Sequence, residues 1–571
     1  MYIINDGKEE NTYQAIVVGS GISGGWAAKE LSEKGLKTLV LERGRDVKHG
    51  DYPTAHKENW DFEGRGRKSL ETLKRQPKQN RTGYTTHPQS SHWFVDDIDH
   101  PYNETKRFDW MRGYHVGGRS IMWGRHSYRW SDLDFEANAK DGVAVDWPIR
   151  YKDIEPWYDY VETIAGLTGK KEGLSQLPDG KFLPNFGFNC LESQVAERIK
   201  KNFGGRVMTL GRIAHITEKR DVHGPNRASC VSRNRCIRGC PYGGYFSSVA
   251  STLPFATASG NMTLRPFSIV TEVIYDKDTN KAKGVRVVDT ETLETHEYFA
   301  DIVFLCASAV ASTSILLNSK SDRFPEGMGN DSGELGHNMM DHHFRVGATG
   351  ISDDFGDKYY KGRRPGGIYL PRFRNLDKSS KQDYLRGFGY QGGASRSNWT
   401  RYVREMSKFG ADMKDELIVP GPWQMGLSGF GECLPYHENK MTLDYEKLDK
   451  FGQPTVTFDV EFKENEITMR EDMKTSAAEM LESCGLKNVA TYDSMGAPGL
   501  GIHEMGTARM GKDSKTSVLN KWNQVHGCEN VFVTDGACMT SASCVNPSLT
   551  YMALTARAAD YAVNELKAGN L

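Results

Sequence analysis

The stretch VVGSGISGG, residues 17–25, decides how the first part of the chain folds. It contains the end of an apolar run, AIVV at 15–18, and is followed by an alanine-rich helical stretch that reaches about residue 34. A second apolar run, LVL at 39–41, ends in Glu42. A strand, a glycine turn, a helix and a second strand with an acidic end form the context in which a dinucleotide binds. The sequence therefore predicts a dinucleotide site at the start of the chain, with an ordinary glycine turn as the alternative.

Each glycine of this stretch has a physical role. Gly19 allows the tight turn, Gly21 lets a pyrophosphate approach the backbone, and Gly24 lets the helix lie close to the strand. The free N–H groups at the start of the helix would face the diphosphate. Glu42 would accept hydrogen bonds from a ribose 2′-hydroxyl and repel a 2′-phosphate, so we expect a ligand without that phosphate.

The same sheet is predicted to return twice later in the chain. The apolar run IVFL at 302–305 leads into a helix that ends near residue 317, and NVFVTDG at 530–536 is a strand that ends in Asp-Gly. An Ala- and Leu-rich helix with proline at its start follows at 547–566. Because buried parallel strands are continuous apolar runs, these segments predict a discontinuous nucleotide-binding domain.

Residues 341–495 have a different pattern, with β-rich runs at 423–427, 440–445 and 454–458 and a helical stretch at 464–484. We expect an α/β protein in which a discontinuous Rossmann-like domain is joined to a substrate domain with an antiparallel sheet flanked by helices. The predicted boundaries are 1–340 for the first part of the nucleotide domain, 341–495 for the substrate domain and 496–571 for the return to the nucleotide domain. Insertions are expected near 50–100 and 130–225, with a cysteine-containing loop at 226–245.

The composition argues against several classes of partner. The 571 residues carry a net charge of -1, with 26% charged and 38% hydrophobic residues, so nothing favours nucleic acid or an anionic membrane. No segment approaches the roughly 18 consecutive apolar residues of a membrane helix, and MYIINDGKEENTYQ at 1–14 lacks the regions of an export signal. We expect no membrane span and no export signal in this chain. The basic segment at 64–81 is either a solvated insertion or a docking surface for another subunit.

Three of the ten cysteines lie within CVSRNRCIRGC, residues 230–240. The spacing C-x5-C-x3-C lacks the C-x2-C pair of most structural zinc sites, and no fourth Cys or His lies at zinc spacing. Free thiols are the expected state of a chain without an export signal, which disfavours a disulfide. Another metal site and three unligated thiols remain open at this point. The other cysteines, such as Cys306 and Cys484, lie singly in apolar segments and are expected in the core.

Three motifs together resemble the glucose-methanol-choline (GMC) flavoprotein oxidoreductases. They are VVGSGISGG at 17–25, HEMGTARMG at 503–511 and VTDGA at 533–537. GGRS at 117–120 and DH at 341–342 are further matches, and the similarity spans nearly the whole chain. The resemblance implies that the nucleotide domain binds FAD in an extended pocket and that the protein oxidises an alcohol, often on a sugar. The residues implied to bind the cofactor are Gly19, Ser20, Gly21, Gly24, Gly25, Glu42, Arg43, Gly117, Gly118, Ser120, Val270, Ala307, Asp535, Gly536, Asn546, Pro547 and Thr550.

His503 is the candidate catalytic base. Oxidation of a carbinol moves a hydride to the flavin while a base removes the hydroxyl proton, and an imidazole with an ordinary pKa near 6.5 suits that task. In the family its partner lies eleven residues after the Asp of the VTDGA-like motif, and counting from Asp535 gives Asn546. Asn546 cannot take the proton, but its amide can hold the substrate oxygen. The plainer alternatives are a buried structural histidine and an asparagine that caps the last helix.

The form NPSLT at 546–550 resembles the branch of the family that contains pyranose oxidase and the sugar dehydrogenases. In pyranose oxidase a histidine of the Gly-Gly loop is bonded to the flavin, whereas the loop VGGRSIMWG at 116–124 has Met122 there. A thioether cannot make that bond, so we expect FAD to be held non-covalently. We expect oxidation of a secondary hydroxyl of a pyranose sugar or glycoside, with C3 favoured. Another carbon, as in glucose, gluconate or fructose dehydrogenases, is the alternative.

The resemblance also gives the three cysteines a role. The large subunits of membrane-linked sugar dehydrogenases hold a three-iron, four-sulfur cluster with three cysteines at such a spacing, which implies Cys230, Cys236 and Cys240 as its ligands. The cluster would carry electrons from the flavin to an external acceptor, and the protein would then be a dehydrogenase. An oxidase that produces hydrogen peroxide and a non-catalytic flavin-binding subunit are the alternatives. The charge of the thiolates and sulfides would be offset by Arg227, Arg233, Arg235 and Arg238.

The same resemblance implies partners. Such large subunits pair with a small subunit that carries the export signal, and they pass electrons to a cytochrome c-type acceptor. We therefore expect a periplasmic location reached by co-export. A cytoplasmic location is the alternative that follows from this chain alone, because the chain has no export signal of its own.

Overall fold

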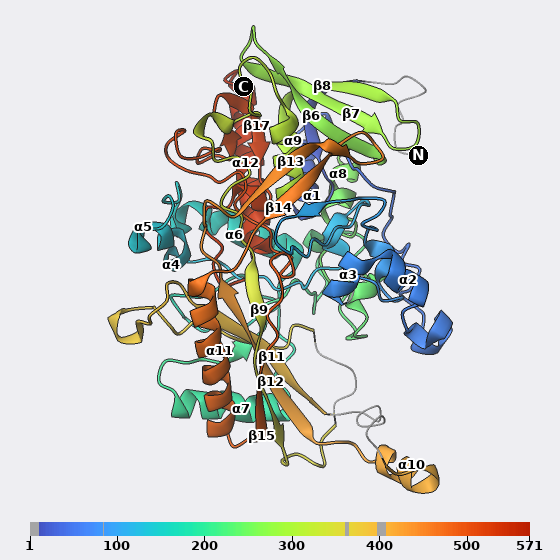
Figure 1. Cartoon of the computed structure of the whole chain (residues 1–571), viewed down its shortest axis with the longest axis vertical. Helices are drawn as coiled ribbons and strands as arrows, with labels where there is room; N and C mark the ends of the chain where they lie inside the picture. Colours follow the sequence, from blue (N-terminus) through green and yellow to red (C-terminus); the bar gives the residue numbers. More distant parts are fainter. Residues whose placement is uncertain (1–10, 84, 360–364, 397–406) are drawn as a thin grey trace.

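The computed structural model describes residues 11–83, 85–359, 365–396 and 407–571. Figure 1 shows two lobes along the long axis, an upper one built around a largely parallel sheet and a lower one built around an antiparallel sheet. Residues 1–10, on which part of the export-signal prediction rests, lie outside the described residues.

The upper lobe contains an eight-stranded sheet. Its strand order is β16-β17-β8-β1-β2-β5, and the hairpin of β6 and β7 joins it through β8. Segments from the beginning, the middle and the end of the chain share this sheet, which confirms the predicted discontinuous α/β fold. The strands are β1 Thr12–Val18, β2 Thr38–Leu41, β5 Met262–Arg265, β6 Ser268–Asp276, β7 Lys281–Asp289, β8 Thr295–Leu305, β16 Gln524–Val525 and β17 Cys528–Val533.

The carboxyl ends of four parallel strands are aligned. Val18 pairs with both Leu41 and Leu305, and Leu305 also pairs with Val533. The residues that follow these strands therefore meet at one edge of the sheet, where open α/β sheets bind their ligands. They are the glycine loop after β1, Glu42 after β2, Cys306 after β8 and Thr534 after β17.

Helix α1 (Ile22–Glu33) starts directly after the glycine loop and packs against α12 (Ser548–Lys567) and α8 (Thr252–Ala258). Its Trp26 has no exposed surface. At Gly24 a Cβ would lie only 1.9 Å from the carbonyl oxygen of Gly19, so the helix can approach the turn this closely only with glycine. α9 (Ala309–Asn318) lies against β6, and α6 (Tyr151–Ala165) lies against α12.

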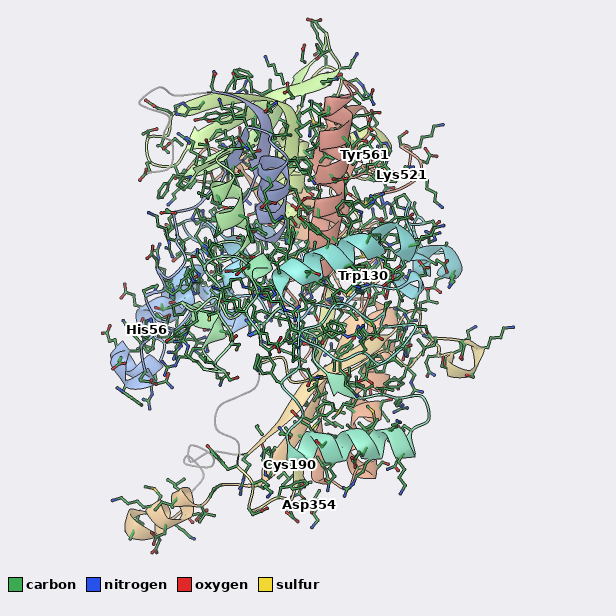
Figure 2. The ribbon with its side chains drawn as sticks, turned by 180° about the vertical axis from the view of Figure 1, so that it is seen from behind. His56, Trp130, Cys190, Asp354, Lys521 and Tyr561 are labelled. Carbon is green, nitrogen blue, oxygen red and sulfur yellow. The ribbon has the colours of Figure 1, made fainter. Side chains whose placement is uncertain are left out.

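The lower lobe contains a six-stranded antiparallel sheet in the order β15-β9-β12-β11-β10-β4. α11 (Glu464–Ser483) and α7 (Cys190–Asn202) pack against this sheet and against each other, and Figure 2 shows α7 crossing the lower lobe from behind. Met469 and Met473 of α11 and Val195 of α7 are buried in the same apolar cluster as Leu427. The predicted antiparallel sheet with flanking helices is confirmed. Its strands are β4 Thr209–Leu210, β9 His342–Ser352, β10 Ile368–Leu370, β11 Phe388–Arg396, β12 Trp423–Glu432 and β15 Lys487–Asp493.

Two strands expected in that sheet form a separate one. β13 (Lys440–Leu448) and β14 (Pro454–Asp459) pair with each other, and β14 also pairs with β3 (Asn103–Glu104). Phe458 stacks on Phe108 with ring centroids 4.0 Å apart, so the pair belongs to an apolar cluster with the segment near residue 108. The boundaries at 340 and 495 stay a prediction.

The remaining helices are short. They are α2 Leu70–Arg75, α3 Pro77–Thr82, α4 Asp132–Phe135, α5 Ala137–Asp141 and α10 Gly410–Ile418. No helix of the described residues is long and apolar enough to cross a membrane.

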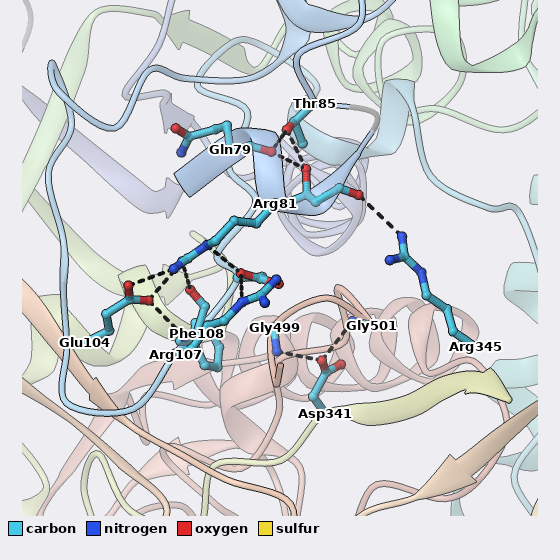
Figure 3. A network of polar contacts seen from close by, with 12 residues as sticks. Gln79, Arg81, Thr85, Glu104, Arg107, Phe108, Asp341, Arg345, Gly499 and Gly501 are labelled. Carbon is cyan, nitrogen blue, oxygen red and sulfur yellow. Dashed lines mark hydrogen bonds and ion pairs between the residues drawn. The ribbon is translucent and has the colours of Figure 1, made fainter. Parts of the chain in front are cut away.

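Part of the basic segment 64–81 is neutralised within the chain. Arg81 forms two hydrogen bonds of 2.9 and 3.0 Å to the carboxylate of Glu104 and lies 3.2 Å from Asp109 (Figure 3). Arg75 donates to Asp96 at 2.7 Å. These ion pairs fit a folded insertion and leave fewer free cations for a docking surface.

Candidate active site

A cavity of about 640 Å³ opens at the carboxyl edge of the parallel sheet and runs from Glu42 to His503. Thirteen of the predicted site residues line it: Gly19, Ser20, Gly21, Glu42, Arg43, Gly118, Ser120, Val270, Ala307, His503, Asp535, Gly536 and Asn546.

Five predicted cofactor residues lie outside the cavity lining. A Cβ on Gly25 would lie 2.5 Å from Thr252 Oγ1, and one on Gly117 would lie 2.7 Å from the side chain of Val249, so these glycines allow close packing, as Gly24 does. The hydroxyl of Thr550 lies 2.8 Å from the buried Tyr158 hydroxyl, and Pro547 directly precedes the first residue of α12.

The glycine loop has the space that a diphosphate requires. A Cβ on Gly21 would meet no atom within 4 Å, and Gly21 lines the cavity. Gly21 is also the N-cap of α1, and no side chain caps this helix. The N–H groups of its first turn are therefore available to an anion.

Glu42 connects the end of β2 to the glycine loop. Its carboxylate accepts hydrogen bonds from Ser20 N at 3.1 Å, Ser20 Oγ at 2.6 Å and Gly44 N at 3.0 Å. Burial raises the pKa of Glu42, and these hydrogen bonds oppose that rise. The open cradle at Gly21 and the acceptor at Glu42 fit the diphosphate and a ribose of FAD.

The ring nitrogens of His503 have distinct partners at the other end of the cavity. His342 Nε2 lies 2.8 Å from the carbonyl oxygen of Ser543, which can only accept, so Nε2 of His342 carries the proton. Burial lowers the pKa of His342 to about 4 and keeps its ring neutral, so its Nδ1 is an acceptor. His503 Nδ1 lies 2.7 Å from that nitrogen and must donate to it. His503 Nε2 is then left with a free electron pair.

Asn546 faces this free electron pair. Gln391 Nε2 of β11 donates to Asn546 Oδ1 at 2.8 Å, which turns the amide nitrogen of Asn546 toward His503. Asn546 Nδ2 lies 3.5 Å from His503 Nε2, and Gln391 also lines the cavity. The pair therefore presents a base and a hydrogen-bond donor side by side.

The electrostatic surroundings of His503 favour the neutral ring. Burial lowers its pKa well below the ordinary value, and His342 and Arg119 lower it further. The guanidinium of Arg119 forms two hydrogen bonds of 3.0 and 2.9 Å to Glu504, which ties the Gly-Gly loop to the histidine motif.

The backbone around His503 is held by Asp341. Its carboxylate accepts from the N–H groups of Gly499 at 2.8 Å, Gly501 at 2.9 Å and His503 at 3.1 Å, and Figure 3 shows the first two of these contacts. Burial, together with Glu504, raises the pKa of Asp341 to about 7. Ile502 has a φ of 61°, a conformation that costs energy for a β-branched residue and that these hydrogen bonds maintain.

The three cysteines of 230–240 line a second, much smaller cavity together with His215 and Tyr245. Burial raises the pKa of Cys230, and Cys236 and Cys240 raise it further, which indicates that the thiols lie near one another. All ten cysteines are free. Within the described ranges, no three His, Cys, Asp or Glu side chains are arranged so that they could hold a metal ion. The thiols thus share one cavity without forming a closed metal site.

The arginines near these cysteines are only partly free to offset their charge. Arg233 and Arg235 line the small cavity, and Arg235 is paired with Glu58. Arg227 is buried, and burial lowers its pKa to about 9. Ile237 lines the large cavity, while Cys236, its neighbour in the chain, lines the small one.

Sequence reasoning missed Gln391 and the part played by His342. His342 belongs to the DH match at 341–342, but no spacing indicates that it contacts His503. Gln391 comes from β11 in the lower sheet, and its contact with Asn546 spans 155 residues of sequence.

The comparisons with known proteins agree with this geometry. The N-terminal family model for GMC oxidoreductases matches residues 13–344, and the C-terminal one matches residues 435–555. The chain belongs to the GMC oxidoreductase family. Family membership implies FAD and makes the protein an oxidoreductase of alcohol groups.

The matches to similar proteins cover almost the whole chain. A 2-methyl-1,2-propanediol dehydrogenase of Mycolicibacterium austroafricanum is 29% identical, and the match covers 96% of this chain and 94% of that protein. The fructose dehydrogenase large subunit of Gluconobacter japonicus is 24% identical over 98% of this chain and 100% of its own length. A formate oxidase structure from Aspergillus oryzae RIB40 has a TM-score of 0.61 at 15% identity, and the match covers 98% of this chain and 100% of that one. This last likeness concerns the fold alone.

Proposed function

We propose that the protein is an FAD-dependent dehydrogenase that oxidises a secondary hydroxyl of a pyranose sugar or glycoside, with C3 favoured. The observation that carries this proposal is the free electron pair of His503 Nε2 beside the amide nitrogen of Asn546 in the large cavity. The similarity of the chain to the fructose dehydrogenase large subunit supports a sugar as the substrate. The similarity to a 2-methyl-1,2-propanediol dehydrogenase makes a small diol the first competing substrate to test.

The residues of the site would divide the reaction between them. His503 Nε2 accepts the hydroxyl proton of the substrate, because its ring is neutral and its Nδ1 is already a donor to His342. Asn546 Nδ2 donates to the same substrate oxygen and orients the carbon that loses hydride. FAD, when bound, supplies the hydride acceptor. Met122 lines the cavity in the Gly-Gly loop and cannot form a flavin bond, so we propose that FAD is held non-covalently.

We further propose that electrons leave through a three-iron, four-sulfur cluster held by Cys230, Cys236 and Cys240. Three thiols around one cavity fit the donor chemistry of such a cluster, and Cys236 of this cavity is followed in the chain by Ile237, which lines the large one. A small subunit and a cytochrome c-type acceptor would then complete the enzyme, and co-export with that subunit would bring it to the periplasm. A cytoplasmic enzyme remains the alternative.

The second candidate is an oxidase that passes electrons from FAD to oxygen and produces hydrogen peroxide. It is favoured by one observation: no group of three potential ligands in the described part of the chain is arranged to hold a metal ion. In this case the cysteines would have no part in turnover.

Three measurements on the purified protein test the proposal. Analysis of iron and acid-labile sulfide, with peroxide detection during turnover, separates the candidates, because the oxidase would contain flavin without iron. Identification of the product from methyl glucosides tests the carbon: a 3-keto glycoside supports the C3 assignment, and oxidation at the anomeric carbon alone would refute it. Acid precipitation should release the flavin from the protein.

A further inference from the structure

The small cavity contains a buried histidine without a partner. His215 is 1% exposed, and within the described residues neither its Nδ1 nor its Nε2 has a hydrogen-bond partner. It lines the same cavity as Cys230, Cys236 and Cys240. Because buried polar groups in native proteins are almost always paired, an imidazole with two unpaired nitrogens beside three thiols is available to a partner bound in this cavity.

The backbone fixes His215 beside the cysteine loop. Cys230 N donates to the carbonyl of Ile216 at 2.7 Å, and Ile216 N donates to the carbonyl of Gly244 at 2.9 Å. His215 also forms a β-bridge with Tyr245, whose ring centroid lies 5.8 Å from that of the imidazole. The backbone that carries the imidazole is therefore part of a hydrogen-bonded framework that includes Cys230, Gly244 and Tyr245.

The ring of His215 has an N–H donor in either protonation state. A neutral imidazole has one N–H donor and one acceptor nitrogen, and a protonated ring has two donors. The sulfides and thiolates of an iron–sulfur cluster carry negative charge and accept hydrogen bonds, so the N–H of His215 matches their chemistry.

We propose that His215 is a positioning residue of the cysteine site and that its ring N–H donates a hydrogen bond to a sulfur atom of the cluster. This inference rests on the proposed cluster at Cys230, Cys236 and Cys240. A hydrogen bond withdraws electron density from the sulfur and stabilises the reduced cluster, so it raises the reduction potential of the electron exit.

The test is a redox titration of the full-length protein, followed by electron paramagnetic resonance, on three variants. His215→Leu removes the donor, and His215→Gln keeps an N–H donor of similar reach. His223→Leu is the matched control: His223 is also 1% exposed and also lies near Arg227, but its Nδ1 already accepts from Arg220 N at 3.1 Å and it does not line the small cavity. Iron and acid-labile sulfide are measured on every sample.

The expected result is an unchanged iron content in all variants, a lower cluster potential in His215→Leu, and a potential near that of the native protein in His215→Gln and His223→Leu. An unchanged potential in His215→Leu, or an equal drop in His223→Leu, would overturn the inference. Loss of one iron per protein in His215→Leu would also overturn it, because His215 would then be a ligand. If the native protein contains no iron, the proposed cluster fails, and this outcome is recognised before any variant is made. If His215→Leu does not fold, a potential in His215→Gln far below that of the native protein refutes the hydrogen bond.

Discussion

The position of the proton on the His503 ring is set by two other residues, His342 and Ser543. The carbonyl of Ser543 orients His342, and His342 in turn orients His503. Ser543 itself has a φ of 57°, so its carbonyl is aimed by a backbone conformation that non-glycine residues seldom adopt. The proposed base is therefore oriented by residues that do not line the large cavity.

Replacing His342 tests this relay. In His342→Leu, Nδ1 of His503 loses its acceptor, and the tautomer with the free Nε2 is no longer favoured. We expect kcat to fall roughly 10²-fold, within the range of general-base effects, while FAD content stays unchanged. His342→Gln, whose amide can both accept and donate, should recover most of this loss. Equal kcat values in the native and His342→Leu proteins would contradict the relay.

The pH dependence of kcat/KM tests the state of His503. The proposed reaction requires the neutral ring of His503, and burial, His342 and Arg119 all lower its pKa. Activity should therefore persist as the pH falls through about 6.5, the ordinary histidine value, and decline only in more acidic solution. A pH profile that loses activity with an apparent pKa at or above that value would show that the ring is not held neutral in this way.

His342 should also make folding stability depend on pH. Its folded-state pKa is lowered to about 4, so the unfolded chain binds its proton more readily than the folded one. The contribution of the neutral ring is fully present above about 6.5, the ordinary histidine value, and is lost progressively as the pH falls toward the folded-state value. Denaturant unfolding of the native and His342→Gln proteins at several pH values measures this, and the native protein should lose more stability on acidification.

At the scale of secondary-structure elements, two glycines near the turn between β1 and α1 have different roles. Gly24 allows close packing, and Gly21 leaves space for binding. A Cβ on Gly24 would lie 1.9 Å from the Gly19 carbonyl oxygen, whereas one on Gly21 would enter the open cavity. Gly24→Ala should therefore destabilise the fold by about 1–3 kcal/mol, as overpacking does. Gly21→Ala should fold normally but bind FAD poorly, because the methyl group occupies the space of the diphosphate. Thermal unfolding and flavin content check both expectations; full flavin in Gly21→Ala would place the diphosphate elsewhere.

The elements of the upper lobe were predictable, because continuous apolar runs and glycine spacing are local signals. The position of Asn546 was also predictable, since its distance of eleven residues from Asp535 recurs in the family. Contacts between strands were not predictable from the sequence. Gln391 meets Asn546 only because β11 crosses the lower sheet in one register, and a strand pattern does not fix its register. The separate pairing of β13 and β14 with β3 depends on Phe458 stacking on Phe108, a contact that spans 350 residues.

At the scale of the whole molecule, residues of both lobes line the large cavity, and the cysteine loop contributes Ile237 to it. Asn546 follows the upper sheet in the chain, while His342 starts β9 of the lower one, so the site depends on both lobes. The large cavity is the proposed substrate site and the small one the proposed electron exit, and the consecutive residues Cys236 and Ile237 line one cavity each.

Removing one cysteine tests this arrangement. Cys236→Ser should lose iron and cytochrome-linked turnover, while small dyes that take electrons directly from the flavin still support substrate oxidation. Cys190→Ser is the control, because Cys190 is a free thiol at the start of α7 and lies outside the small cavity. Undiminished cytochrome reduction by Cys236→Ser would exclude the cysteines from the electron path.

The most direct test of the central claim is an anaerobic reduction of the native protein by a methyl glucoside, followed by flavin absorbance and by electron paramagnetic resonance. We predict that the flavin bleaches and that the signal of an oxidised three-iron cluster, present beforehand, disappears with it. Flavin bleaching in a protein that never displays an iron signal would contradict the account and identify an oxidase.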